Sequence, residues 1–309
     1  MTLHIDSSPR LLGASTLRCA PIAYGFWRFA GTDVKSAREK VELALELGID
    51  LFDHADIYGV DGGGSFGDAE LLFGKVLKEA PSLRERFVLA TKGGIVLGLP
   101  YDSSAGYIRK AVDASLTRLG VDVIDLYQIH RPDFLGHPAE LAEVLSALRT
   151  EGKIREVGVS NYTTSQTRAL QAHLPFALAT SQPEFSCIRH HALRDGSLDL
   201  CLETGVTPLA WSPLAGGTLG LSRDEAAKQP NGDRLVACID VLDRIAQEQS
   251  LSRAAVAIAW TMLHPSGVMP ILGTQNPDRL RDCMNATRVQ MTRAQWNEVL
   301  VAAQGEPLP

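Results

Sequence analysis

The stretch LFDHADIYG, from Leu51 to Gly59, starts like a buried strand and ends in a group of polar side chains. Its first two residues are apolar, and two carboxylates, a histidine and a tyrosine follow between Asp53 and Tyr58. Functional side chains commonly stand where a strand of a parallel sheet ends. The fold class therefore depends on whether other segments repeat this pattern.

Eight short apolar runs of this kind occur along the chain, and most are followed by a segment with helical spacing. They are PIAYGF (21–26), GIDLFD (48–53), FVLATK (87–92), VIDLYQIH (123–130), REVGVS (155–160), LATSQ (178–182), TPLAW (207–211) and VMPILG (268–273). Strands that alternate with amphipathic helices indicate a parallel sheet. Eight units, with no G-x-G-x-x-G after the first strand, predict a closed (β/α)8 TIM barrel rather than an open sheet. Segments 234–250 and 292–305 predict extra peripheral helices.

Length and composition are consistent with one domain over residues 1–309. The chain is 45% hydrophobic and 21% charged with a net charge of −6, which is typical of a globular protein without a basic surface for nucleic acid or membrane. Its five cysteines are scattered, and the start MTLHIDSSPR lacks a basic segment followed by an apolar run. We expect a cytoplasmic protein, a monomer or weak homo-oligomer, that acts on a small molecule.

Four titratable side chains follow three consecutive predicted strands. Asp53 and Tyr58 follow the second strand, Lys92 ends the third, and His130 ends the fourth. Each has an ordinary explanation by itself: a turn cap, a loop aromatic, a solvated lysine or a core histidine. Because the carboxyl ends of barrel strands share one rim, we expect the four to form one site.

Such a set can act as a proton donor. A free tyrosine has a pKa of about 10, and a nearby ammonium group lowers it by favouring the phenolate. Lys92 can supply that charge, Asp53 can serve as its counter-ion, and His130 can hydrogen-bond a substrate oxygen. We therefore expect the pKa of Tyr58 to be lowered.

The chain resembles the aldo-keto reductase family. The resemblance rests on GIDLFDHADIYG, LATKGG, DLYQIHRPD, GKIREVGVSNY, TSQPEFS, AWSPLAGG and ILGTQNPDRL, which occur in the family's order over nearly the whole chain. The pattern is most similar to that of bacterial putative oxidoreductases. It implies a barrel that binds NADPH without a Rossmann fold and reduces a small aldehyde or ketone to an alcohol. By this resemblance Tyr58 is the general acid, Lys92 and Asp53 tune it, and His130 orients the carbonyl.

The same resemblance implies a set of cofactor-binding positions. They are Gly25, Asp53, Ser160, Asn161, Gln182, Trp211, Ser212, Leu214, Gly216, Gly217, Thr274 and Arg279. Ser160, Asn161 and Gln182 match the residues that hold the nicotinamide carboxamide, and Trp211 matches the aromatic that stacks on its ring. The stretch from Ser212 to Gly217 falls where the pyrophosphate is covered.

Thr274 and Arg279 match positions that contact the 2′-phosphate of NADPH. Two departures from the family pattern lie close by, since Gly273 replaces a frequent lysine and Cys283 replaces a frequent asparagine. Arg279 makes NADPH the expected cofactor, although an ordinary solvated arginine is the alternative. Trp27 is expected at the substrate mouth, with a position in the core as an equal alternative.

Three other hypotheses use the same residues. Lys92 could form a Schiff base in a lyase, or the barrel could sense a nucleotide or bind a partner with little turnover. His54, Asp56, His130 and Asp133 could together hold a metal, but no typical zinc spacing occurs and His54 should point away from Asp53 on a strand. We expect no metal site, and we expect Asp56 to face loop hydrogen bonds or solvent.

Overall fold

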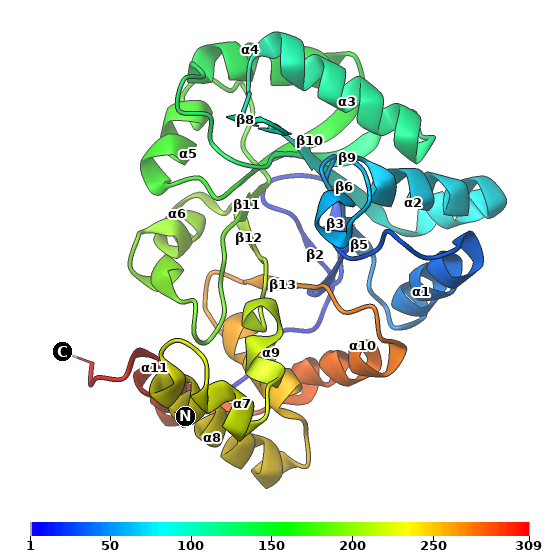
Figure 1. Cartoon of the computed structure of the whole chain (residues 1–309). Helices are drawn as coiled ribbons and strands as arrows, with labels where there is room; N and C mark the ends of the chain where they lie inside the picture. The colour runs from blue at the N-terminus through cyan, green and yellow to red at the C-terminus, as the bar shows by residue number, and fades with distance from the viewer. Residues whose placement is uncertain (1, 309) are drawn as a thin grey trace.

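Eight parallel strands form a closed barrel at the centre of the computed structural model, which describes residues 2–308 (Figure 1). They are β4 (Ala23–Gly25), β5 (Leu51–Asp53), β6 (Val88–Gly93), β9 (Ile124–Ile129), β10 (Ile154–Ser160), β11 (Thr180–Gln182), β12 (Thr207–Ala210) and β13 (Met269–Leu272). Each strand pairs with its neighbour in chain order, and β13 closes the ring on β4. Each of the eight predicted runs overlaps one barrel strand, and the predicted (β/α)8 barrel is confirmed.

Helices surround the barrel and cover its outer surface (Figure 1). Seven follow or precede the barrel strands: α1 (Val34–Glu46), α2 (Asp68–Glu79), α3 (Ala105–Leu119), α4 (Pro138–Thr150), α5 (Thr164–Gln171), α6 (Ser197–Thr204) and α9 (Arg253–Met262). The local sequence determines their ends. Asp33, for example, accepts a hydrogen bond from the Ser36 amide at the start of α1, and Gly120 adopts φ 67° after α3.

Further helices lie at the edge of the barrel. They are α7 (Arg223–Ala227), α8 (Gly232–Gln249), α10 (Pro277–Cys283) and α11 (Arg293–Gln304), and the 3₁₀ turns are η1 (Val60–Gly62), η2 (Pro81–Arg86), η3 (His191–Leu193), η4 (Ala215–Gly220) and η5 (Met284–Arg288). The helices α8 and α11 are those predicted from segments 234–250 and 292–305. Trp260 and Trp296 join α9 to α11, because their rings stack at 4.7 Å and each indole N–H donates to the other's carbonyl oxygen.

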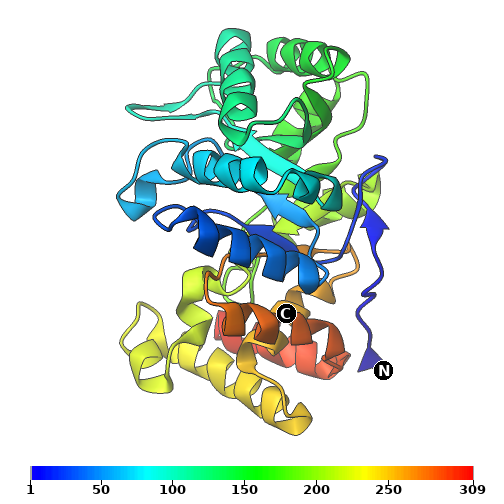
Figure 2. The ribbon, with the colours of Figure 1, turned by 90° about the vertical axis from the view of Figure 1, so that its right-hand side faces the viewer.

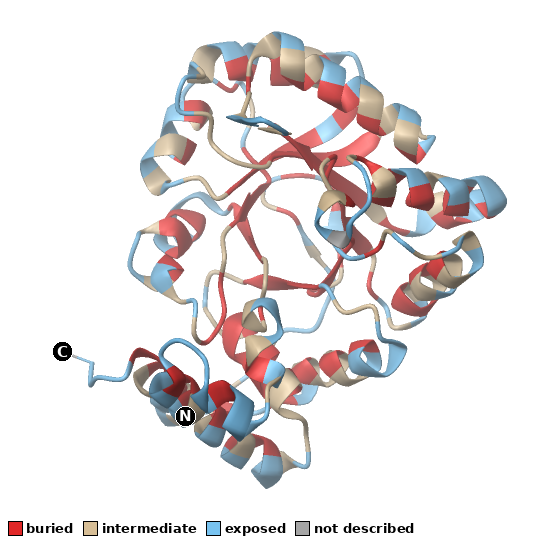
Figure 3. Ribbon diagram, viewed as in Figure 1, coloured by how far each residue is buried: buried red, intermediate tan, exposed pale blue. Residues whose placement is uncertain are grey.

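The core has two layers, and the buried strands separate them (Figure 3). Leu51, Ala90 and Leu126 belong to the smaller cluster inside the barrel. Phe52 and Phe73 belong to the larger cluster between strands and helices. Alternate residues of each strand thus face opposite layers, as the two-residue period of a strand requires.

A hairpin that the sequence did not predict closes the N-terminal end of the barrel. It consists of β2 (Arg10–Leu11) and β3 (Arg18–Cys19), which pair antiparallel. Leu12, at its tip, is buried in the inner cluster, and the Gly13 amide donates to Thr207 Oγ1 at 2.8 Å. Gly13 has φ 56°, and a Cβ there would lie 2.7 Å from the Ala179 carbonyl oxygen, so the turn requires glycine.

The C-terminal ends of the strands carry the longer connections (Figure 2). A second unpredicted hairpin, β7 (Ile95–Val96) and β8 (Leu99–Tyr101), projects there after β6, and η1 projects after β5. At the chain ends, β1 (Thr2–Leu3) pairs with β14 (Met291–Thr292). Of the helices within residues 2–308, none has the length and apolar character required to cross a bilayer.

Candidate active site

Asp53, Lys92 and His130 lie at one rim of the barrel because β5, β6 and β9 are adjacent strands. Asp53 pairs in register with Ala90, and Lys92 pairs with Gln128, two residues before His130. Tyr58 joins them from the loop after β5, and its ring centroid lies 5.8 Å from that of His130. The four side chains that the sequence placed at three strand ends are therefore close together.

Lys92 is fully buried and bonded on two sides. Its Nζ lies 2.7 Å from Asp53 Oδ2 and donates to the His54 carbonyl oxygen at 2.8 Å. Burial by itself would lower the pKa of Lys92, but the Asp53 carboxylate and the Tyr58 hydroxyl raise it above its usual value. Lys92 is therefore a fixed ammonium group, and the alternative of a solvated strand end is wrong.

Tyr58 lies against this ammonium group, with Lys92 Nζ 4.9 Å from its ring centroid. Burial raises the pKa of Tyr58, and the opposing charge of Lys92 does not cancel this effect. The expected lowering of this pKa is thus wrong for the protein without ligands, because the cost of burying a phenolate exceeds the attraction of one ammonium group. The Tyr58 hydroxyl is protonated at neutral pH.

His130 is held as a neutral imidazole. Burial lowers its pKa well below the usual value, and the charges of Lys92 and Arg131 lower it further. A neutral imidazole carries one N–H donor, which can bind a carbonyl oxygen. The Nδ1 atom of His130 is buried and has no hydrogen-bond partner among residues 2–308, so this histidine is not a satisfied core residue.

The second oxygen of Asp53 is bound by two glutamine side chains. Gln182 Nε2 donates to Asp53 Oδ1 at 3.1 Å, and Gln128 Nε2 donates to the same atom at 3.2 Å. Thr180 Oγ1 donates to Gln128 Oε1 at 3.1 Å and fixes that amide. Sequence reasoning did not identify Gln128, although it is a polar residue inside the otherwise apolar run DLYQIH.

Ser160, Asn161, Gln182 and Trp211 meet at the ends of β10, β11 and β12. Ser160 Oγ donates to the Gln182 carbonyl oxygen at 3.1 Å and accepts from Asn161 Nδ2 at 2.8 Å. Asn161 Nδ2 also approaches the His130 carbonyl oxygen at 3.2 Å. Asn161 Oδ1 accepts the Trp211 indole N–H at 3.0 Å. Both ends of the Asn161 amide therefore bind protein groups, which links the predicted cofactor residues to His130.

A left-handed turn follows Trp211. Ser212, Ala215, Gly216 and Gly217 all have positive φ, at 52°, 50°, 69° and 103°. A Cβ at Gly216 or Gly217 would meet no atom within 4 Å. The positive φ, and not a lack of space, therefore favours glycine at these two positions. Leu214 lies in the same turn, and its carbonyl oxygen accepts the Gly217 amide at 3.0 Å. The turn thus has room for a ligand against its glycines.

The other predicted cofactor residues lie around β13 and α10. Arg279 is exposed in the first turn of α10, and its backbone amide donates to Asn276 Oδ1. The Thr274 carbonyl oxygen accepts the Tyr24 hydroxyl at 3.1 Å. Gly25 packs against β13, because a Cβ there would lie 2.8 Å from Ile271 Cγ2. Arg279 is thus an exposed cation at this end of the rim.

Trp27 follows the C-terminal end of β4 by two residues and contacts the loop that follows Tyr58. Its side chain is 42% exposed, so the alternative of a core position is wrong. The indole N–H donates to Asp61 Oδ2 at 2.5 Å, and Arg28 Cζ lies 5.0 Å from the indole ring centroid. Asp61 belongs to η1, which follows Tyr58 by two residues.

The side chains of the histidine and the second aspartate of LFDHADIYG make no hydrogen bond to the site within residues 2–308. His54 points into the outer layer as predicted, where its ring stacks on Phe26 at 3.8 Å. Asp56 was expected in loop hydrogen bonds or solvent, and this is wrong. Its side chain is buried, and neither carboxylate oxygen has a hydrogen-bond partner within the described part of the chain. Burial and the nearby charge of Glu70 raise the pKa of Asp56 well above the usual value.

The residues considered for a metal site do not come together. His54 lies in the outer layer, and the Asp133 carboxylate accepts the backbone amides of Ser103 and Leu135, each at 2.9 Å. Over residues 2–308, no group of three or more His, Cys, Asp and Glu side chains has an arrangement that could hold a metal ion.

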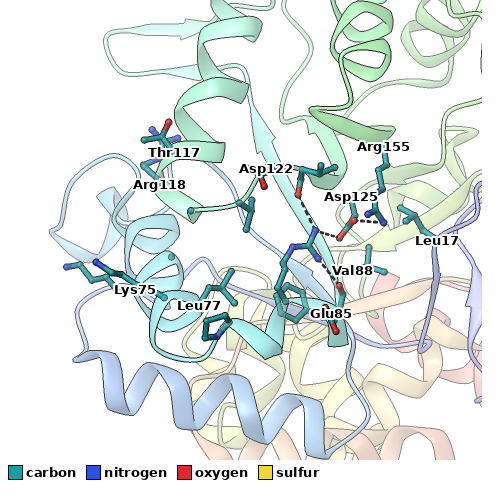
Figure 4. A pocket seen from close by; sticks show the side chains of 18 of the residues that line it. Leu17, Lys75, Leu77, Glu85, Val88, Thr117, Arg118, Asp122, Asp125 and Arg155 are labelled. Atoms are coloured by element: carbon teal, nitrogen blue, oxygen red, sulfur yellow. Dashed lines mark hydrogen bonds and ion pairs between the residues drawn. The ribbon is translucent and has the colours of Figure 1, made fainter.

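A hollow of about 1100 Å³ lies at the opposite end of the barrel, beside η2 and the starts of β6 and β9 (Figure 4). Asp125 lies within it and binds Arg84 at 2.8 Å and Arg155 at 3.1 Å. The same carboxylate accepts the Leu89 amide at 2.8 Å. These contacts join the starts of β6, β9 and β10, so we assign them a structural role.

Comparisons with known proteins agree with this geometry. Residues 21–302 match the model of the aldo/keto reductase family. A 6-dehydroglucose reductase from Novosphingobium aromaticivorans is 50% identical over 309 residues, which cover 99% of both chains. A protein of the same name from Agrobacterium fabrum is 38% identical, with 96% of this chain and 98% of the relative covered. The crystal structure of a thermostable aldo-keto reductase has the same fold, with a TM-score of 0.79 at 21% identity over 96% of this chain and 99% of the other. This chain therefore belongs to the aldo-keto reductase family, and it is an oxidoreductase of small carbonyl compounds.

Proposed function

We propose that this protein reduces an aldehyde or ketone to an alcohol with NADPH, and that Tyr58 donates the proton. The observation that carries the proposal is the group formed by the half-buried Tyr58 and the buried Lys92 and Asp53, with Lys92 Nζ bonded to Asp53 at 2.7 Å. A protonated tyrosine beside a fixed ammonium group is a suitable acid, because the phenolate formed by proton loss is stabilised at once.

The chain's own residues manage the proton and the carbonyl oxygen. NADPH, when bound, would supply the hydride for the carbonyl carbon, and the electron pair of the C=O π bond would pass to the oxygen. The Tyr58 proton neutralises that oxygen and yields the alcohol, and Lys92 stabilises the remaining phenolate. The neutral imidazole of His130 donates its N–H to the carbonyl oxygen and orients it. Solvent then returns a proton to Tyr58.

The charge state of Lys92 supports a reductase over a Schiff-base lyase. A lysine nucleophile must be neutral, and such lysines are commonly desolvated without a counter-ion. Here Asp53 lies 2.7 Å from Nζ, and the pKa of Lys92 is raised rather than lowered. The ammonium form therefore predominates, which favours support of Tyr58 over carbonyl attack.

The rim also suits a nicotinamide dinucleotide. The half-buried Trp211 offers an aromatic face, Ser160 and Gln182 offer polar groups for a carboxamide, and the left-handed turn at Gly216 offers open space. Asn161 would join them in holding the carboxamide, and its amide also positions Trp211 and the His130 backbone. Arg279 would bind the 2′-phosphate. We further propose that residues 1–309 act as a single barrel domain.

The names of two relatives direct the choice of substrates. Both are called 6-dehydroglucose reductase, and one is 50% identical to this chain. We therefore propose sugar aldehydes as the first class to test, before simple aldehydes, ketones and dicarbonyls.

The decisive experiment replaces Tyr58 by phenylalanine. We expect Tyr58→Phe to reduce kcat at least about 100-fold, the usual range for loss of a general acid, with little change in NADPH affinity. NADPH oxidation measured at 340 nm gives the rate, and quenching of tryptophan fluorescence gives the affinity. Comparable turnover in the variant would rule out Tyr58 as the acid. Tight NADPH binding by the wild type without oxidation on any carbonyl would instead favour a sensing role.

A further inference from the structure

Trp27 is an exposed aromatic side chain with a fixed position. It follows β4 by two residues, and the Phe26 amide before it donates to the Asp53 carbonyl oxygen at 3.0 Å. Its backbone is thus joined to the strand end that carries the proposed ion pair. Trp27 nevertheless stays 42% exposed, so its aromatic ring is accessible to a ligand.

Asp61 holds the indole from a loop that packs closely on itself and on α2. Gly59 has φ 129°, and a Cβ there would lie 2.5 Å from the Ser65 carbonyl oxygen, so the loop packs closely on itself. Asp68 Oδ2 accepts the Ser65 amide at 2.6 Å, and the Ala69 amide donates to the Tyr58 carbonyl oxygen at 3.1 Å. The loop that carries Asp61 is therefore continuous with Tyr58 and anchored to α2.

We propose that Asp61 is a positioning residue for substrate recognition: its hydrogen bond to Trp27 fixes the indole relative to Tyr58, so that a polyhydroxylated aldehyde packs on the ring while its carbonyl meets Tyr58. The inference rests on the proposed carbonyl reduction and extends it to a substrate class. An indole face suits the C–H face of a sugar, and a carboxylate acceptor restricts the ring to one orientation.

The inference predicts a dependence on substrate length. On this inference a six-carbon aldehyde such as 6-dehydroglucose would extend from the carbonyl to the indole and gain contact there. Glycolaldehyde, with two carbons, would occupy only the region of Tyr58 and His130. Loss of the Asp61 contact should therefore weaken binding of the longer aldehyde alone.

The experiment compares Asp61→Ala, Asp61→Asn, Trp27→Phe and the Asp61→Ala/Trp27→Phe double variant with both aldehydes. Asp61→Asn keeps an oxygen acceptor, and Trp27→Phe keeps an aromatic ring but removes the N–H donor. Asp224→Ala removes an exposed carboxylate of α7 and serves as the matched control. Melting temperatures and NADPH affinities are measured for every variant.

For 6-dehydroglucose we expect Asp61→Ala to raise KM about five- to tenfold with kcat within about twofold, as loss of one charge-assisted hydrogen bond predicts. Asp61→Asn should recover most of the affinity. The double variant should resemble Asp61→Ala, because both changes remove the same contact. Asp61→Ala should leave kcat/KM for glycolaldehyde unchanged, and Asp224→Ala should leave the kinetics of both aldehydes unchanged.

Each alternative result has a separate meaning. Equal losses for both aldehydes in Asp61→Ala would overturn the inference and give Asp61 a purely structural role. Wild-type turnover of glycolaldehyde without turnover of 6-dehydroglucose would overturn the substrate class. Turnover of no carbonyl by the wild type would instead refute the proposed function itself.

Discussion

At the residue scale, charge and burial act in opposite directions on each group of the site. Burial favours the neutral forms of Tyr58 and His130, while the Asp53 carboxylate keeps Lys92 charged. As a result, Tyr58 is a neutral acid, His130 is a neutral hydrogen-bond donor, and Lys92 is a cation. This combination fits protonation of a carbonyl oxygen at neutral pH.

Arg131 provides a test of the His130 assignment. Its charge lowers the pKa of His130, so Arg131→Gln should raise that pKa. Because the neutral imidazole is the proposed active form, kcat/KM is lost as pH falls through this pKa. The acid side of the kcat/KM profile should therefore move to higher pH by roughly half a unit.

The measurement is kcat/KM between pH 4.5 and 8 with a saturating concentration of NADPH. Arg189→Gln is the control, since Arg189 is exposed and faces Glu184 at 3.9 Å. An unmoved acid limb in Arg131→Gln would mean that another group controls it.

At the element scale, the packing of the loop after β5 against β6 and α2 buries the Asp56 carboxylate without a hydrogen-bond partner among residues 2–308. Glu70 of α2 binds Arg118 at 2.7 Å and accepts from Thr91, so the charge of Arg118 is already matched. Asp56 lies nearby, and its backbone amide donates to the Lys92 carbonyl oxygen at 2.9 Å. A Cβ on Gly93 would lie 3.1 Å from Asp56 Oδ2, which shows how closely the elements pack.

We expect Asp56→Asn to stabilise the protein at pH 8. The pKa of Asp56 is raised in the folded state, so the folded chain holds a proton that the unfolded chain releases above about pH 4. Stability from this group is present at low pH and decreases as pH rises. Asparagine avoids that loss, and thermal melting should show an increase of about 2 °C for each kcal/mol gained.

Asp53→Asn is the contrasting variant, because it removes the partner of a buried ammonium group and should lower the melting temperature at the same pH. Below about pH 4 the advantage of Asp56→Asn should disappear. Destabilisation by Asp56→Asn at pH 8 would show that the ionised carboxylate has a partner in solution.

At the scale of the whole molecule, the two ends of the barrel have different roles. The β2–β3 hairpin closes one end, and the connections after the strands surround the other (Figure 2). A dinucleotide bound as proposed would extend from Trp211 past the turn at Gly216 to Arg279. Its adenosine end would then lie at α10, far along the chain from Tyr58.

Cofactor preference tests this extended placement. Arg279→Ala should weaken NADPH binding about five- to tenfold and leave NADH binding unchanged, since only NADPH carries the 2′-phosphate. Fluorescence titration with each nucleotide measures both constants. Arg281→Ala, an exposed arginine of the same helix, is the control. Equal weakening of both nucleotides by Arg279→Ala would place the 2′-phosphate elsewhere.

The sequence by itself determined the barrel and the four residues of its rim. Strand and helix periods are local, and each of Asp53, Lys92 and His130 is recognisable as a polar residue at the end of an apolar run. Their meeting then follows from the parallel order of β5, β6 and β9. For Trp27 the sequence left two alternatives open, a position at the substrate mouth and a position in the core.

The tertiary structure alone decided the charge states and the contacts between distant segments. Gln128 reaches Asp53 across 75 positions, Asp61 reaches Trp27 across 34, and the hairpin around Leu12 closes the barrel from the N-terminus. The direction of the Tyr58 pKa and the burial of Asp56 depend on how much water the surrounding elements exclude. Desolvation and pairing are properties of assembled neighbours, and no local pattern of residues specifies them.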